Sequence, residues 1–173
     1  MSNLLYFEDL SVGDVWTSAA RTITETDVVN FAGMTGDYDP LHVDHEFARQ
    51  TPYRRPIAHG LLGLSLVAGL ASNCPQVRTL AFVAIQKWEF RLPIFIGDTV
   101  HATTEVLDKR AAGRRSGHIT WKRQLINQSG SPVQVGVFET LVALGQPRVS
   151  SRRVPPGASG LRAATDAQDR DEL

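Results

Sequence analysis

Residues 35–45 read TGDYDPLHVDH and gather three aspartates and two histidines around one proline. Pro40 fixes its own φ angle and disfavours a helical conformation for Asp39, so the stretch predicts a turn. The turn would place Asp37 and His42 at the two ends of a tight reversal, where their side chains could converge. A carboxylate and an imidazole that share a site can hold one water molecule and divide proton acceptance and donation between them.

The same stretch allows two other interpretations. In the first, the aspartates only bond to backbone amides of the turn, and His42 begins the next segment. In the second, His42, Asp44 and His45 supply nitrogen and oxygen ligands to a metal ion such as zinc or iron. Asp44 is well placed to cap a following helix, and no further ligand stands at a recognisable spacing. We therefore expect no metal at this turn.

A second candidate element, RRPIAHG at residues 54–60, precedes the most apolar segment of the chain. A helix that begins near Gly60 would leave free backbone N–H groups, which could bind an anion or the oxygen of a developing enolate. Arg54 and Arg55 could meet a phosphate, although a basic pair beside a loop is more often only solvated. His59 could belong to the site or could be a structural hydrogen-bond donor.

Ser65 stands in GLSLV, a near match to the GxSxG motif of serine hydrolases. Val67 occupies the position of the last glycine, and Ser65 lies inside an expected helix, away from a strand-to-helix turn. A Ser–His–Asp hydrolase is therefore not expected.

The secondary-structure elements that must position these residues are mainly helices in the N-terminal half of the chain and strands from residue 80 onward. We expect a short strand and loop at residues 7–14, a helix that Thr24 caps and that ends near residues 33–36, and a short helix capped by Asp44. Residues 57–72 predict a buried helix, since their apolar run is shorter than the ~20 residues of a bilayer span. Extended segments are expected at residues 80–90, 99–107, 118–127 and 133–144. This order predicts an α+β domain whose antiparallel β-sheet wraps around a long central helix.

Composition narrows the class of protein further. A chain of 173 residues suits one domain, which we assign to residues 1–145, followed by a polar tail at residues 146–173. The 18 basic and 18 acidic residues balance, so neither nucleic acid nor an anionic membrane is an expected partner. A single cysteine, Cys74, excludes a disulfide framework and suits a cytoplasmic protein. The N-terminus lacks the basic and apolar regions of a signal peptide.

Three motifs together resemble the MaoC-like dehydratases, a family that includes the (R)-specific enoyl-CoA hydratases. They are GDYDPLHVD at 36–44, RPIAHGLLGLS at 55–65 and FRLPIFIGDTV at 90–100. Their order and spacing are those of the family, and the resemblance covers roughly residues 7–145. It implies a hot-dog fold, which agrees with the predicted sheet and helix. It also implies a homodimer, or a higher assembly of dimers, with active sites at the interface.

The resemblance implies roles for individual residues. Asp37 and His42 match the catalytic acid–base pair. Ser65 matches the helix serine that orients this pair, and Gly60 matches the glycine whose amide region faces the thioester oxygen. Asp39 departs from the family, which often carries asparagine here. A second carboxylate close to Asp37 would raise one of the two pKa values.

The implied reaction is reversible syn addition of water to a trans-2-enoyl-CoA, which gives a (3R)-3-hydroxyacyl-CoA, a step of fatty acid metabolism. It implies an acyl-CoA substrate and neither a metal nor a redox cofactor. The candidates for substrate binding are Asp39, His59, Arg54, Arg55 and Arg91, the arginines as partners of the CoA phosphates. Two alternatives stay open: a hot-dog acyl-CoA thioesterase and a non-catalytic acyl-CoA-binding subunit. The Asp37-x4-His42 spacing favours hydration, because it pairs both groups in one loop before the helix.

Overall fold

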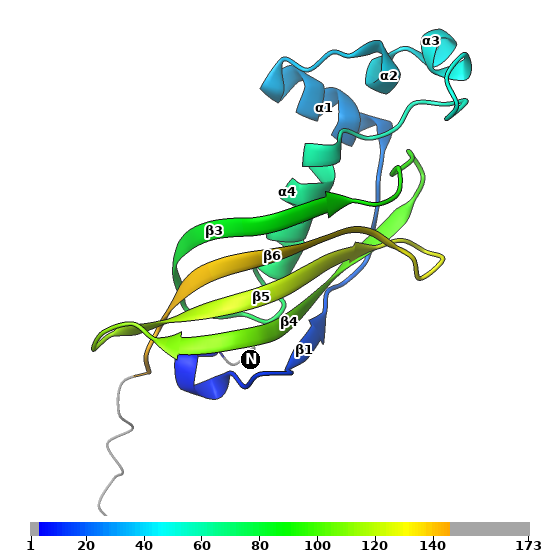
Figure 1. The fold of residues 1–173 in the computed structure, drawn as a ribbon. Helices are drawn as coiled ribbons and strands as arrows, with labels where there is room; N and C mark the ends of the chain where they lie inside the picture. The colour runs from blue at the N-terminus through cyan, green and yellow to red at the C-terminus, as the bar shows by residue number, and fades with distance from the viewer. Residues whose placement is uncertain (1–3, 146–173) are drawn as a thin grey trace, which may run out of the picture.

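An antiparallel sheet curves around one helix in the computed structural model, which describes residues 4–145 (Figure 1). The strands lie in the order β1 (Val15–Thr17), β4 (Thr99–Ala111), β5 (Ser116–Ile126), β6 (Pro132–Ala143) and β3 (Thr79–Phe90), and β2 (Arg21–Thr22) also pairs with β4. Helix α4 (Gly60–Ala71) packs against β4 and β5. This arrangement confirms the expected α+β hot-dog fold.

Strands β4, β5 and β6 bury alternate residues, because one face of the sheet meets α4 and the other faces solvent. Trp121 on β5 and Phe138 on β6 are cross-strand partners and the largest side chains of the core. Strand β3 differs, since most of its residues are exposed on both faces. Its exposed side chains include Phe82 at 51% and Ile85 at 40%. The sheet therefore ends in an uncovered apolar edge.

The N-terminal segment corrects one expectation. Residues 7–9 form a 3₁₀ helix, η1 (Phe7–Asp9), and the strand expected within residues 7–14 begins only at Val15. The Asp9 carboxylate accepts a hydrogen bond from the Tyr6 backbone N–H at 2.8 Å, which stabilises a tight turn in place of extended backbone.

The helices agree more closely with the expectations. Helix α1 (Glu25–Thr35) is capped by Thr24 and ends at Gly36, whose φ of 78° closes the helix in the left-handed conformation. Two short helices follow, α2 (Pro40–Val43) and α3 (His45–Arg49), and Asp44 caps the second. Together α1, α2 and α3 lie beyond the first turn of α4, at one end of the sheet (Figure 1).

Helix α4 begins three residues later than the apolar run suggests. Residues 57–59 are extended, because the Ala58 N–H donates to the Ile94 carbonyl at 2.8 Å and Ile57 forms a β-bridge with Phe95. Within residues 4–145, α4 and the other helices are too short or too polar to cross a bilayer. The polar tail expected at residues 146–173 lies outside the described part of the chain.

Candidate active site

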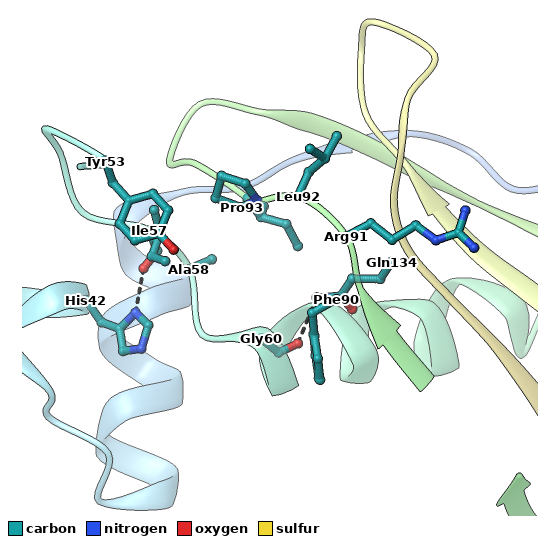
Figure 2. Close-up of a pocket in the computed structure, with 11 residues that line it drawn as sticks. His42, Tyr53, Ile57, Ala58, Gly60, Phe90, Arg91, Leu92, Pro93 and Gln134 are labelled. Carbon is teal, nitrogen blue, oxygen red and sulfur yellow. Dashed lines mark hydrogen bonds between the residues drawn. The ribbon is translucent and has the colours of Figure 1, made fainter. Parts of the chain in front are cut away.

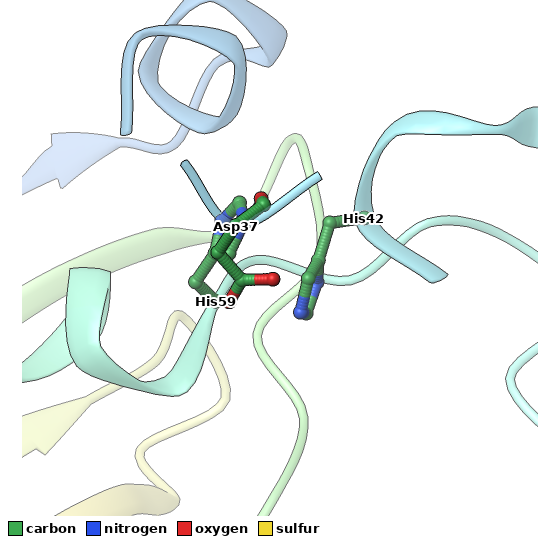
Figure 3. Close-up of side chains that lie close together, drawn as sticks. All are labelled: Asp37, His42 and His59. Carbon is green, nitrogen blue, oxygen red and sulfur yellow. The ribbon is translucent and has the colours of Figure 1, made fainter. Parts of the chain in front are cut away.

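The α1–α2 turn and the start of α4 bring three side chains together (Figure 3). One carboxylate or ring nitrogen atom from each of Asp37, His42 and His59 lies within 4.8 Å of the other two. Asp37 follows the left-handed Gly36, and His42 lies on α2, so the turn does bring these two residues into proximity as their spacing predicts. Asp37 is exposed and His42 is half-buried, which leaves the pair open to a ligand.

His42 is held in one neutral tautomer by the backbone. Its Nδ1 lies 2.7 Å from the Ile57 carbonyl oxygen (Figure 2). Because a carbonyl only accepts hydrogen bonds, Nδ1 carries the hydrogen, and Nε2 of the neutral ring keeps its lone pair. His42 can therefore accept or return a proton at Nε2 without losing the bond that orients it.

His59 lies beneath the pair. It is 2% exposed, and its Nε2–H donates to the backbone carbonyl of Asp37 at 2.9 Å. Its ring stacks on the ring of His42 with the centroids 3.9 Å apart, and the ring of Phe31 packs at 5.0 Å. These contacts support the structural interpretation of His59, because they place it as a support for both members of the pair and not in the wall of the cavity.

Asp39 caps a helix. Its Oδ1 accepts a hydrogen bond from the Leu41 N–H at 2.9 Å, at the start of α2. Its own N–H donates to Oδ1 of Asp37 at 3.3 Å. The turn-capping interpretation therefore describes Asp39, whereas the carboxylate of Asp37 accepts only this one long bond among the described residues.

The metal interpretation requires His42, Asp44 and His45 to share one site, and the structure does not bring these residues together. Asp44 caps α3, and His45 bonds to Glu25 at 2.9 Å. The cluster that does form is Asp37, His42 and His59, and the planes of its two rings are tilted by 32° to each other. One nitrogen of each ring already bonds to a backbone carbonyl, so the groups left free are one nitrogen of each ring and the Asp37 carboxylate, a set that can transfer protons.

A cavity of about 250 Å³ opens beside His42 (Figure 2). Its walls are mainly apolar and aromatic and come from residues 57–58, residues 90–94 and Tyr53. Gly60, the first residue of α4, lies at its base. Of the pair, His42 lines the cavity, whereas Asp37 lies close to His42 and does not line it. An apolar cavity that borders one titratable side chain and a helix N-terminus fits an acyl thioester.

The base of the cavity contains a residue that sequence reasoning missed. Gln134 on β6 is 2% exposed, and its Nε2–H donates to the Gly60 carbonyl at 2.9 Å. Two glycines admit this side chain and its neighbour: a Cβ on Gly63 would lie within 3 Å of Gln134, and a Cβ on Gly60 would lie 2.9 Å from the ring of Phe90. The only sequence signal was an amide among the apolar residues that begin this strand.

Ser65 is not brought to the pair within the described chain. It is exposed on α4, and its hydroxyl donates to the Leu61 carbonyl one turn earlier, at 2.9 Å.

The three candidate arginines have different surroundings. Arg54 has a φ of 62° and donates to the Arg49 carbonyl at 3.3 Å. The guanidinium of Arg55 lies 3.9 Å above the ring of Phe95. Arg91 alone of the three borders the cavity, and it pairs with Glu89 at 2.8 Å.

Comparisons with known proteins agree with this geometry. Residues 11–127 match the family model of the MaoC like domain. A 3-hydroxybutyryl-CoA dehydratase of Methylorubrum extorquens is 36% identical over 113 residues, which cover 65% of this chain and 71% of the relative. An (R)-specific enoyl-CoA hydratase of Rhodospirillum rubrum is 38% identical over 104 residues, or 60% of this chain and 70% of the relative.

Solved structures show the same fold. The (R)-hydratase from A. caviae superposes with a TM-score of 0.68 at 30% identity, over 80% of this chain and 99% of its own. An Archaeoglobus protein described as a monoamine oxidase regulatory protein reaches a TM-score of 0.78 at 35% identity, over 84% of this chain and 99% of its own.

Proposed function

Because the chain belongs to the MaoC-like dehydratase family, we propose that it reversibly hydrates a trans-2-enoyl-CoA to a (3R)-3-hydroxyacyl-CoA. Relatives named as dehydratases and hydratases show that it is a hydro-lyase. The observation that supports the finer assignment is the convergence of Asp37 with His42, which lines a cavity that also borders the start of α4.

In the proposed reaction, Asp37 and His42 hold one water molecule between them. The water oxygen bonds to C3 of the enoyl group, and one member of the pair accepts a proton from the water. The pair delivers one proton to C2 on the same face, so it ends with as many protons as it had at the start. The C2=C3 double bond is replaced by one C–O and one C–H bond, so atoms balance without a redox partner. His42 suits this role because its Nε2 is the nitrogen that the Ile57 carbonyl leaves free.

Negative charge grows on the thioester oxygen as the C–O bond forms. The first N–H groups of a helix lack acceptors within the helix, so the start of α4 at Gly60 supplies donors for that oxygen. Gln134 holds the Gly60 carbonyl and thereby the orientation of this first turn. Preorganised donors of this kind stabilise the transition state more than the substrate.

The thioester substrate supplies its own activation, so we propose that no metal or redox cofactor takes part. The CoA moiety would extend from the mouth of the cavity, where Arg91 is the arginine best placed to meet a phosphate. Its ion pair with Glu89 is exposed and would exchange for a phosphate at small energetic cost.

We also propose that the working unit is a homodimer. Strand β3 offers an unpaired edge, and the exposed Leu61 and Ser65 lie on α4. A second copy that covers this surface would bury apolar side chains and enclose Ser65.

The test is a spectrophotometric assay of the full chain with crotonyl-CoA and with a longer trans-2-enoyl-CoA. Loss of the conjugated-thioester absorbance without release of free thiol, with a (3R) product, would support the hydratase. Thiol release would replace the proposal with a thioesterase, and binding of both substrates without turnover would indicate a non-catalytic subunit.

A further inference from the structure

Arg123 is a buried cation without a counter-charge. It lies on the helix-facing side of β5 and is 8% exposed. Within residues 4–145 its guanidinium forms no ion pair or hydrogen bond, and its Nε is enclosed without an acceptor. Burial lowers the pKa of Arg123 to about 10, so the side chain is still protonated at neutral pH. An isolated charge inside a protein is costly unless an opposite charge neutralises it.

The neighbouring groups compensate this charge only in part. The guanidinium carbon lies 5.0 Å from the ring centre of Phe138 and 5.9 Å from that of Trp121, distances at which a ring face attracts a cation. Helix α4 ends nearby at Ala71, and the end of a helix carries roughly half a negative charge. The carboxylates of the adjacent strands, Glu105 and Glu139, pair with other cations.

A small cavity lies at this guanidinium. It measures about 30 Å³, large enough for one small ion or one or two water molecules, and lies between the end of α4 and the sheet. Thr104, the cross-strand partner of Arg123 on β4, is 1% exposed and also lines it. The Thr104 hydroxyl has no partner among the described residues. Two buried side chains whose polar atoms lack partners, Arg123 and Thr104, therefore line one small, partly open cavity.

We propose that this cavity binds a small monovalent anion of halide size, such as chloride, between the guanidinium of Arg123 and the hydroxyl of Thr104. The anion neutralises the buried charge and accepts hydrogen bonds from both side chains. The site is separate from the proposed active site, because Gly60 and Ala71 stand at opposite ends of α4, roughly 16 Å apart along the helix axis.

The first experiment uses crystals of the full chain grown in sodium bromide, because bromide scatters anomalously and replaces chloride. The expected result is an anomalous peak within hydrogen-bonding distance of Arg123 and Thr104. A cavity that holds only water, with no peak, overturns the proposal.

The second experiment measures thermal unfolding in sodium chloride and in sodium gluconate at equal ionic strength, since gluconate is too large for the cavity. Chloride at about ten times its Kd should raise the Tm by roughly 3 °C relative to gluconate. Arg123→Met should abolish this difference. The variant should still fold, since replacing an uncompensated buried charge with an apolar side chain of similar length is often neutral or stabilising.

Two further variants complete the test. Arg110→Met removes an exposed arginine that pairs with Glu139, and it should keep the full chloride response. Thr104→Val removes only the hydroxyl and should weaken chloride binding by about fivefold. An equal chloride response in wild type and Arg123→Met overturns the proposal. A bromide peak without any anion-specific stabilisation overturns it too, because it means binding at crystal concentration only.

Discussion

The imidazole rings of His42 and His59 are in contact, with their centroids 3.9 Å apart and their planes tilted by 32°. One ring is half-buried and borders the cavity, whereas the other is buried and bonds to the backbone of Asp37. A single buried side chain thus contacts both members of the proposed acid–base pair. The geometry of the pair therefore depends on a residue that does not line the cavity.

His59→Phe should therefore impair catalysis without unfolding the protein. Phenylalanine keeps a ring beneath His42 but loses the donor to the Asp37 carbonyl, so Asp37 becomes free to shift. A displacement of about 1 Å can cost up to roughly 100-fold, and we expect kcat to fall 10- to 100-fold with little change in KM. Steady-state kinetics and circular dichroism would check this. His45→Gln, which loses only an exposed pair with Glu25, is the control.

Asp37→Asn and His42→Gln should each lower kcat for hydration by roughly 10³-fold, the scale of general acid–base catalysis. Asp39→Asn is the matched control, since asparagine caps a helix about as well as aspartate and should leave kcat within about twofold of wild type. Wild-type turnover by either dyad variant would refute the assignment of the pair.

Gln134→Met should lower kcat while leaving the free energy of unfolding nearly unchanged. The substitution removes the bond to the Gly60 carbonyl, but it also removes the buried, unpartnered Oε1 of Gln134. These losses offset each other, so the free energy of unfolding should change by less than about 1 kcal/mol. Because the first turn of α4 loses the hydrogen bond that orients it, kcat should fall about tenfold. A large loss of stability with unchanged kcat would show that Gln134 serves packing alone.

Acid should weaken the start of α1. Partial burial opposes ionisation of Asp27, but bonds from Thr24 and the charge of Arg21 outweigh it and hold the pKa below 3.8. A depressed carboxyl pKa stabilises the folded state above the unfolded value and loses that effect as pH falls through the folded value. Asp27→Asn removes the charge that pairs with Arg21 and should cost up to about 1 kcal/mol at pH 7. Urea unfolding at several pH values should show this difference shrink as the pH falls below 3.8 and disappear once Asp27 is protonated in the folded state as well.

The uncovered edge of β3 predicts a dimer that one charge can disrupt. Ile85→Lys places an ammonium group on this edge, where lysine opposes strand pairing. Sedimentation velocity at micromolar concentration should show a dimer for wild type and a monomer for the variant. Val12→Lys changes a 60% exposed residue outside the sheet and should remain dimeric. A monomeric wild type would contradict the proposed assembly.

Local chemistry explains which features the sequence could predict. Asp37 and His42 stand five positions apart on either side of Pro40, so turn stereochemistry alone brings them together. The same holds for the caps at Thr24 and Asp44. The prediction of a strand at residue 7 was wrong because the side chain of Asp9 accepts a hydrogen bond from the backbone. The hydrophobic pattern of the sequence does not reveal this competing bond.

Contacts between distant segments could not be predicted in this way. The bond from Gln134 to Gly60 joins residues 74 positions apart, and the cavity of Arg123 forms only where β5 meets the end of α4. His59 was identified as a candidate, but its role depends on which residue its ring faces. Strand pairing and helix packing decide these contacts. A single sequence considered alone does not specify the register of the strands.

The carbonyl that fixes the tautomer of His42 belongs to a peptide group and not to a side chain. No amino-acid exchange at position 57 deletes that acceptor, so evolution is free to reshape this part of the cavity wall and alter acyl preference while the proton stays on Nδ1. Only a change in the path of the chain between Pro56 and His59 would release it. That path is itself tied to Ile94 through Ala58. The side chain at position 57 can therefore change the acyl preference while the backbone of the same residue keeps the tautomer of His42 constant.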